Sequence, residues 1–179
     1  MERGLKKRLD GEGADINKVA IRIGDVAGAI GKGLIAGLIG TAAITASTMI
    51  EARIRGRGQS SAPADAAGKV LGVQPRGEEE KVRFSNAVHW GYGTMWGATR
   101  GLLGAGGLNG LIASAAHFGA VWSTALVMLP ALGVSPPVTK WGAREIAIDG
   151  LHHLIYAAAV GLAYNLLDRG KLYESQNDI

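Results

Sequence analysis

The spacing of the charged residues constrains this chain most, because it leaves apolar stretches long enough to cross a membrane. Nearly all of the charge falls in residues 1–32, 51–83, 140–149 and 168–178. A helix that crosses the hydrocarbon core needs roughly 20 mostly apolar residues. Four segments meet this length or come close to it. The sequence therefore predicts an all-α, polytopic membrane protein with four transmembrane helices.

The predicted organisation is a single four-helix transmembrane domain between two polar tails. Two of the spans are less apolar than the others, which is tolerated where polar side chains face the bundle interior. Residues 14–31 alternate apolar and charged positions and indicate an interfacial amphipathic helix before the first span. The predicted segments are a tail over 1–23, a domain over 24–168 with spans 25–50, 85–108, 110–134 and 146–167 and a long polar loop over 51–84, and a tail over 169–179.

Glycine is unusually frequent, at 28 of 179 residues, and it recurs every four residues inside the predicted spans. Residues four apart lie on one helix face, and close backbone approach is what binds helices in a bilayer. We therefore interpret these glycines as a packing device of the glycine-zipper type and not as phosphate-binding loops. The predicted packing positions are Gly33, Gly37, Gly93, Gly97, Gly101 and Gly119.

Several ionisable residues fall inside or at the ends of the predicted spans, where such residues are functional candidates. At 1.5 Å per residue they form two layers. One holds His89, His152 and His153, and the other holds Arg100 and His117. Glu145 and Asp149 join the first layer on the last span, at helical spacing from the two histidines.

Three interpretations of these residues stay open. Asp149 lies four positions before His153, where a carboxylate favours a protonated imidazole, fixes its tautomer and could relay protons. The same imidazoles could hold a metal or haem. Alternatively, the polar residues are hydrogen-bonded across helix interfaces, and the acids cap the start of a helix. The sequence contains no complete catalytic or metal-binding motif, so we predict no catalytic residue, metal or cofactor.

The part of the chain after the long polar loop resembles the YagU-like family of small bacterial inner-membrane proteins. The likeness rests on a proline-rich segment, a tryptophan, and an acid four residues before a histidine, and it covers roughly residues 85–168. The residues that match are Pro130, Gly133, Ser135, Pro136, Pro137, Val138, Trp141, Asp149 and His153. The resemblance implies a four-span protein of the bacterial inner membrane and carries no established activity.

The partner classes follow from the membrane assignment. A sequence pI near 9.5 fits contact with anionic lipid headgroups and predicts no nucleic-acid partner. Lys and Arg are nearly balanced between the two sides, and we expect both termini in the cytoplasm. The first functional hypothesis is an accessory subunit that packs against other membrane proteins or copies of itself. The alternatives are a small oligomeric transporter or proton or ion conduit that uses Asp149 and His153, and a haem or metal protein that uses His89, His152 and His153.

Overall fold

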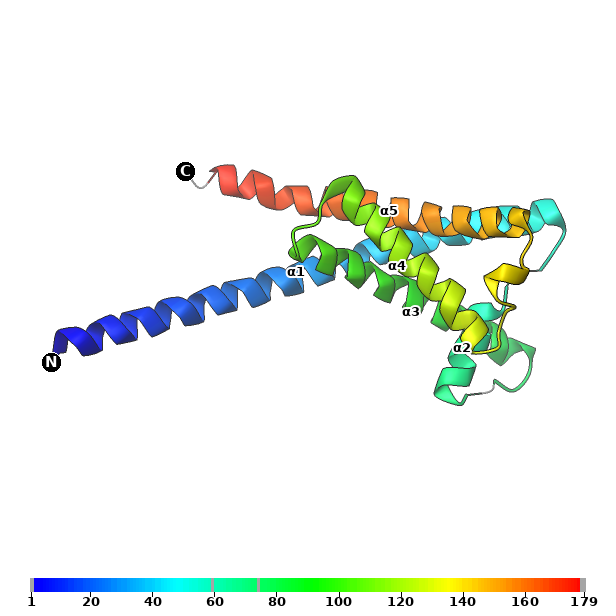
Figure 1. The fold of residues 1–179 in the computed structure, drawn as a ribbon, viewed down its shortest axis with the longest axis horizontal. Coiled ribbons are helices and arrows are strands. Elements are labelled where there is room, and N and C mark those ends of the chain that lie inside the picture. Colours follow the sequence, from blue (N-terminus) through cyan, green and yellow to red (C-terminus); the bar gives the residue numbers. More distant parts are fainter. Residues whose placement is uncertain (1, 59, 74, 178–179) are drawn as a thin grey trace.

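A computed structural model describes the backbone of residues 2–58, 60–73 and 75–177, and the side chains of residues 23–58, 60–73 and 75–169. In this part of the chain all regular structure is helical, which confirms the predicted all-α class. Four of the helices are long, and two of the connections contain short helical pieces; Figure 1 shows their arrangement. The elements are α1 (Glu2–Arg55), α2 (Ala62–Leu71), α3 (Glu78–Ala105), α4 (Gly110–Ala131), the 3₁₀ turn η1 (Val138–Lys140) and α5 (Ala143–Asn177).

The predicted boundaries were wrong in several places, because helices continue beyond the apolar core into polar sequence. The predicted N-terminal tail, interfacial helix and first span form one continuous helix, α1. The side chains of residues 14–22 lie outside the described part, and with them much of the predicted amphipathic face. The predicted loop over 51–84 contains α2 and the charged start of α3. The predicted C-terminal tail continues α5 to Asn177.

Three helices in the described part are long and apolar enough to cross a membrane. These segments are Ile23–Arg55, Gly110–Ala131 and Ala143–Arg169. They match the first, third and fourth predicted spans, and they are compatible with a multi-pass membrane protein. The second predicted span, 85–108, is not confirmed. Its helix, α3, begins with a charged turn and carries a buried arginine, Arg100.

The glycines of α1 and α3 bring the backbones of these two antiparallel helices into contact. A Cβ atom on Gly97 would overlap the carbonyl oxygen of Gly33 and would lie 2.5 Å from the Cα of Gly37. A Cβ on Gly101 would overlap the carbonyl oxygen of Ala29. Any side chain at these positions would force the helices apart, so the two predicted ladders lie against each other.

Gly119 makes no close contact with another helix of the described chain, unlike the other predicted packing glycines. A Cβ on Gly119 would have no described neighbour within 4 Å outside its own helix turn. It lies on an exposed face of α4 with Ala115 and Ser123. The physical reason is that α4 turns the opposite face, with Ala113, His117 and Val121, towards the bundle.

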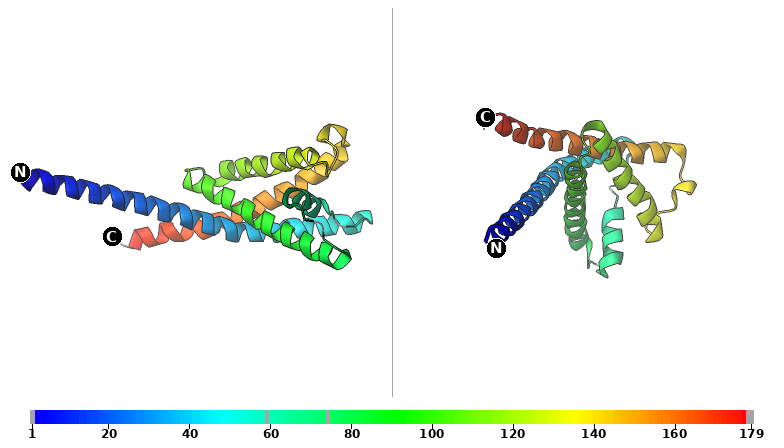
Figure 2. Two further views of the ribbon diagram at one scale, coloured as in Figure 1. Left: turned by 90° about the horizontal axis from the view of Figure 1, so that it is seen from below. Right: turned by 60° about the vertical axis from the view of Figure 1, so that its left-hand side comes forward.

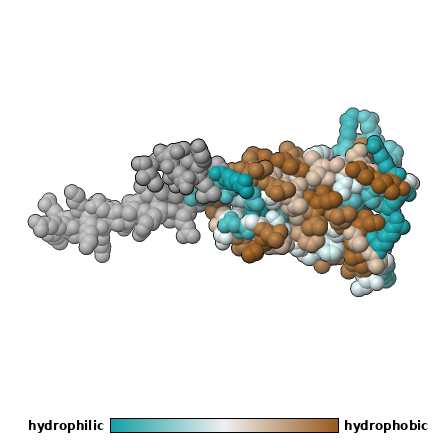
Figure 3. Space-filling model, turned by 90° about the horizontal axis from the view of Figure 1, so that it is seen from above, coloured by the Kyte–Doolittle hydropathy of each residue, from teal (hydrophilic) through white to brown (hydrophobic). Residues whose placement is uncertain are grey.

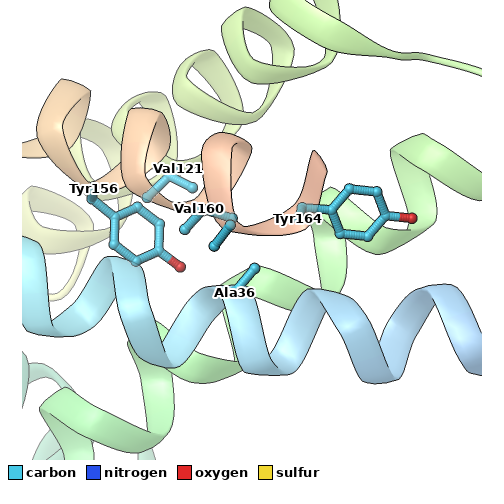
Figure 4. Packing of buried hydrophobic residues seen from close by; sticks show 6 residues of the cluster. Ala36, Val121, Tyr156, Val160 and Tyr164 are labelled. Carbon is cyan, nitrogen blue, oxygen red and sulfur yellow. The ribbon is translucent and has the colours of Figure 1, made fainter. Parts of the chain in front are cut away.

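The helix α5 lies along α1 and supplies most of the apolar core. Tyr156, Val160 and Tyr164 are buried against Ala36 of α1 and Val121 of α4, as Figure 4 shows. A glycine allows this approach too, since a Cβ on Gly40 would overlap the side chain of Val160. The core is small, and apolar side chains cover much of the outside (Figure 3), with hydrophilic residues gathered at the ends of the apolar band.

The helices α3 and α4 meet at a tight turn and then diverge, as the left view of Figure 2 shows. The turn uses Gly107 and Gly110, whose φ angles of 92° and 57° favour glycine. At the open end, α2 packs on α3. The Lys69 ammonium of α2 donates hydrogen bonds to the carbonyls of Leu132 and Gly133, just beyond the end of α4, at 2.7 and 3.1 Å. The short helix α2 therefore bridges the two diverging helices.

Candidate functional site

The divergence of α3 and α4 leaves a cavity of about 650 Å³ in one half of the bundle. Its walls come from α1, α2, α3, α4 and α5. Most of the residues that line it are apolar or aromatic, and a smaller group of polar side chains shares the space. Four members of the first predicted layer, all except Glu145, belong to the polar lining, together with three neighbours: His89, Asp149, His152, His153, Thr41, Thr45 and Tyr156.

Hydroxyl groups of α1 hold two of the imidazoles. The Thr45 hydroxyl lies 2.8 Å from Nε2 of His89 and donates its own proton to the carbonyl of Thr41. It must therefore accept from His89, which places the proton of a neutral ring on Nε2. Ser47 lies 2.8 Å from Nδ1 of His152. Both contacts cross a helix interface, as one of the three interpretations from the sequence expects.

The carboxylate of Asp149 contacts a tryptophan that the sequence does not indicate. The indole Nε1 of Trp122 on α4 donates to Oδ2 of Asp149 at 2.8 Å. The imidazole of His153 lies nearby, with 3.5 Å between its Nδ1 and the same Oδ2. The shorter contact of Nδ1, at 2.9 Å, is with the backbone carbonyl of Asp149. Because a carbonyl only accepts, Nδ1 carries the proton, and Nε2 of a neutral His153 is an acceptor.

The three histidines of the first predicted layer and Asp149 are thus brought to one cavity without forming one hydrogen-bonded cluster. His89 bonds to Thr45 and does not pair with Asp149 or His153. In the described part of the chain, no three His, Asp or Glu side chains come close enough together to hold a metal ion. The haem or metal alternative therefore gains no geometric support from the positions of these histidines.

Glu145 belongs to a different cluster, at the polar end of the bundle. It forms a two-pronged contact with Arg55 of α1, with both N–O distances at 2.9 Å. Arg55 also contacts Glu51, and Arg57 contacts Glu51 in turn. Glu145 therefore forms an ion pair in the first turn of α5. This agrees with the alternative in which the acids lie at the start of a helix. Glu145 does not line the cavity.

The two residues of the second layer are completely buried inside the bundle. Arg100 and His117 are both 0% exposed. Arg100 donates to the side-chain oxygen of Asn165 at 2.9 Å, and its guanidinium lies 4.3 Å from the ring centroid of Tyr164. Nε2 of His117 donates to the backbone carbonyl of Trp96 at 3.0 Å. The two residues share a level, as predicted, but each has its own partner.

Tyr156 connects the two layers. Its hydroxyl donates to the carbonyl of Gly93 at 2.5 Å, and its ring lies 5.7 Å from that of His117. It also lines the cavity and belongs to the apolar core. Tyr156 therefore both lines the cavity and contacts His117 of the second layer.

Four buried nitrogen atoms have no hydrogen-bond partner within the described residues. They are Nε and Nη1 of Arg100, Nδ1 of His117 and Nε2 of His152. Buried polar groups are normally paired, because each unpaired one costs free energy. His152 is only 7% exposed and lines the cavity. Its Nε2 is thus a buried polar atom without a described partner, on a residue that lines the cavity.

Sequence reasoning missed most of the partners of the polar residues. Trp122 has the ordinary signature of an apolar span residue, and Asn165 lies in the last predicted span without a motif around it. Nothing in the sequence around Trp122 indicates that its indole contacts a carboxylate of another helix. The missed partners are Thr45, Ser47, Trp122, Tyr164 and Asn165.

This arrangement offers a polar, hydrogen-bonding site inside an apolar bundle. Comparison with models of known protein families, with curated protein sequences and with solved structures found no match to this chain. The cavity and its side chains are therefore the basis on which a function is proposed.

Proposed function

We propose that α3 is a fourth membrane span. The direction of the helices supports this. Contacts pair Thr45 with His89 and Lys32 with Asp168, so α1 runs antiparallel to both α3 and α5. α4 begins where α3 ends (Figure 1). If α1 and α4 both cross in one direction, α3 must carry the chain back. From Phe84 to Ala105 the only charged residue is Arg100, and that side chain is buried.

Cysteine labelling tests the fourth span directly, because the chain has no native cysteine. Single substitutions Ser60→Cys and Asn109→Cys place a thiol in the connections before and after α3. We expect a membrane-impermeant maleimide to label them from opposite sides of sealed vesicles. A Ser135→Cys variant is the matched control and should label from the same side as Ser60→Cys. Labelling of Ser60→Cys and Asn109→Cys from one side would contradict a spanning α3.

We propose that the protein is a small transporter or ion conduit whose cavity is the substrate site, acting as an oligomer because four spans are few for such a task. The observation that carries this proposal is the cavity of about 650 Å³ with Asp149, His152 and His153 in its wall. Ionisable residues that face a cavity inside a membrane bundle mark ion and substrate pathways. The volume falls in the range of small-molecule sites.

Proton flux into proteoliposomes tests this function. Wild type, Asp149→Asn and His153→Ala should be compared under an imposed potential with an internal pH dye. Glu79→Gln, which changes an exposed acid of α3 outside the cavity, is the matched control. We expect flux in wild type and in the control and a reduction of tenfold or more in the two cavity variants. Equal flux in all four proteins would exclude these residues from any conducting pathway.

A second function is an accessory role in a larger membrane complex. The observation that favours it is the exposed face of α4 with Ala115, Gly119 and Ser123. Small residues at this spacing suit close approach of another helix. Extraction in a mild detergent followed by native mass analysis should detect a homo-oligomer or an associated subunit. Replacement of Gly119 by leucine should dissociate it, and a monomer in the wild type would contradict this role.

We further propose a bacterial inner membrane as the location, with both termini in the cytoplasm. The location rests on the resemblance to YagU-like proteins. The shared side of the termini rests on the four-span arrangement. Maleimide labelling of Ser60→Cys in intact cells gives the orientation, since this thiol should react from the periplasmic side. Labelling of Ser60→Cys only after the cells are opened would reverse the proposed orientation.

A further inference from the structure

The walls of the cavity differ in their chemistry from one helix to the next. α3 contributes three aromatic rings, those of Trp90, Tyr92 and Trp96, and α5 adds the ring of Tyr156. The side that belongs to α4 is aliphatic and includes Val121, Ala125, Met128, Leu129 and Leu132. A molecule in this space would therefore meet aromatic faces on one side and flexible aliphatic side chains on the other.

The cavity carries a net negative charge, because its lining arginine is already paired with a glutamate and its lining aspartate has no such partner in the described part of the chain. Among the described Asp, Glu, Lys and Arg side chains, those that line the cavity are Arg57 and Asp149. Arg57 is paired with Glu51. Asp149 contacts the neutral indole of Trp122 at 2.8 Å, and its nearest basic group is the imidazole of His153 at 3.5 Å. Its side chain is 33% exposed, so a ligand can reach the carboxylate.

A carboxylate inside an apolar bundle needs a positive partner. Moving an ionised carboxylate from water into such surroundings without a positive partner is unfavourable. His153 supplies a partner only when it is protonated, and its Nδ1–H is directed at a backbone carbonyl at 2.9 Å. A cation inside the cavity would neutralise Asp149 and would also be attracted to the faces of the surrounding rings.

We infer that the cavity binds an apolar organic cation, with the positive group beside Asp149 and the apolar groups against the α4 wall. This inference rests on the proposed function of the cavity as a substrate site and names the class of substrate. A molecule with several hydrocarbon or aromatic groups around one cationic centre matches both the volume and the lining.

Two ions of almost the same shape and opposite charge provide the test. Binding of tetraphenylphosphonium and of tetraphenylborate to the full chain in a mild detergent should be measured by equilibrium dialysis, with empty micelles as the blank. We expect saturable binding of the phosphonium ion only. Asp149→Asn should weaken it at least tenfold, which corresponds to about 1.4 kcal/mol. Asp149→Glu should retain binding, and the control Glu79→Gln should equal wild type.

Each other outcome overturns the inference in a recognisable way. Saturable binding of the borate ion would give the cavity an anionic ligand. Phosphonium binding that is unchanged in Asp149→Asn would place the cation elsewhere. Binding of neither ion would remove the organic cation as the ligand class. Proton flux measured on the same preparation separates the two proposals. Flux without phosphonium binding overturns only the ligand class. Absence of both flux and phosphonium binding overturns the proposed function. Size-exclusion profiles confirm that the variants fold.

Discussion

Replacing Gly97 with alanine should drive α1 and α3 apart and destabilise the bundle. The added Cβ would overlap the carbonyl oxygen of Gly33 and lie 2.5 Å from the Cα of Gly37, which is about 1 Å closer than ordinary van der Waals contact. Both neighbours are backbone atoms, so no side-chain rotation relieves the overlap. The helices must separate along the whole contact, and the neighbouring pairs around Gly33, Gly37 and Gly101 lose contact too.

Overpacking of this kind costs about 1–3 kcal/mol. Gly91→Ala is the matched control on the same helix, since a Cβ there meets no described neighbour within 4 Å outside its own turn. Its effect should stay within about 0.5 kcal/mol. A membrane protein that loses its tertiary packing in detergent keeps its helices. The helix preference of alanine over glycine therefore affects both states alike and contributes little to the stability change of Gly97→Ala or of Gly91→Ala. The difference between the two variants therefore reports the helix–helix contact.

The measurement is a titration of dodecyl sulfate into protein held in a mild detergent. Loss of packing can be followed by the fluorescence of the four tryptophans, two of which lie on α3. We expect the midpoint for Gly97→Ala at a lower dodecyl sulfate fraction than for wild type, and that for Gly91→Ala near wild type. If Gly97→Ala were as stable as Gly91→Ala, the close contact of α1 and α3 would not contribute to stability, and the reasoning would fail.

Three further predictions use the same titration or hydrogen exchange. Tyr156→Phe removes a buried hydrogen bond to the backbone of α3 and should lower stability by about 0.5–1.5 kcal/mol; an unchanged midpoint would contradict this. Arg100→Met should leave the stability of the bundle unchanged or raise it. Asn165→Leu leaves the buried guanidinium without its acceptor and should destabilise the bundle by about 2 kcal/mol or more. Equal effects of the two substitutions would refute this reasoning. Lys69→Met should speed amide exchange in α2 and leave α5 unchanged, and slow exchange throughout α2 would show that other contacts hold it.

Local periodicity explains how much of this protein is predictable from its sequence. Apolar runs between charge clusters predicted an all-α membrane protein, and three of the four predicted spans have the required length and apolarity. The spacing of four residues placed Gly33 and Gly37 on one face of α1, and Gly93, Gly97 and Gly101 on one face of α3. These are properties of a single helix, since residue spacing alone determines which side chains share a face.

The tertiary structure decided which faces meet and which side chains become partners. Asp149 has Trp122 as its donor, and Arg100 has Asn165 as its acceptor, although nearer candidates in the sequence exist. The face of α4 with Gly119 turned outward, and the cavity arose because α3 and α4 diverge from their turn. The physical reason is that the rotation and tilt of each helix depend on all of its neighbours at once. Spacing along one helix determines neither its rotation nor its tilt, so the partners of the polar residues could not be predicted.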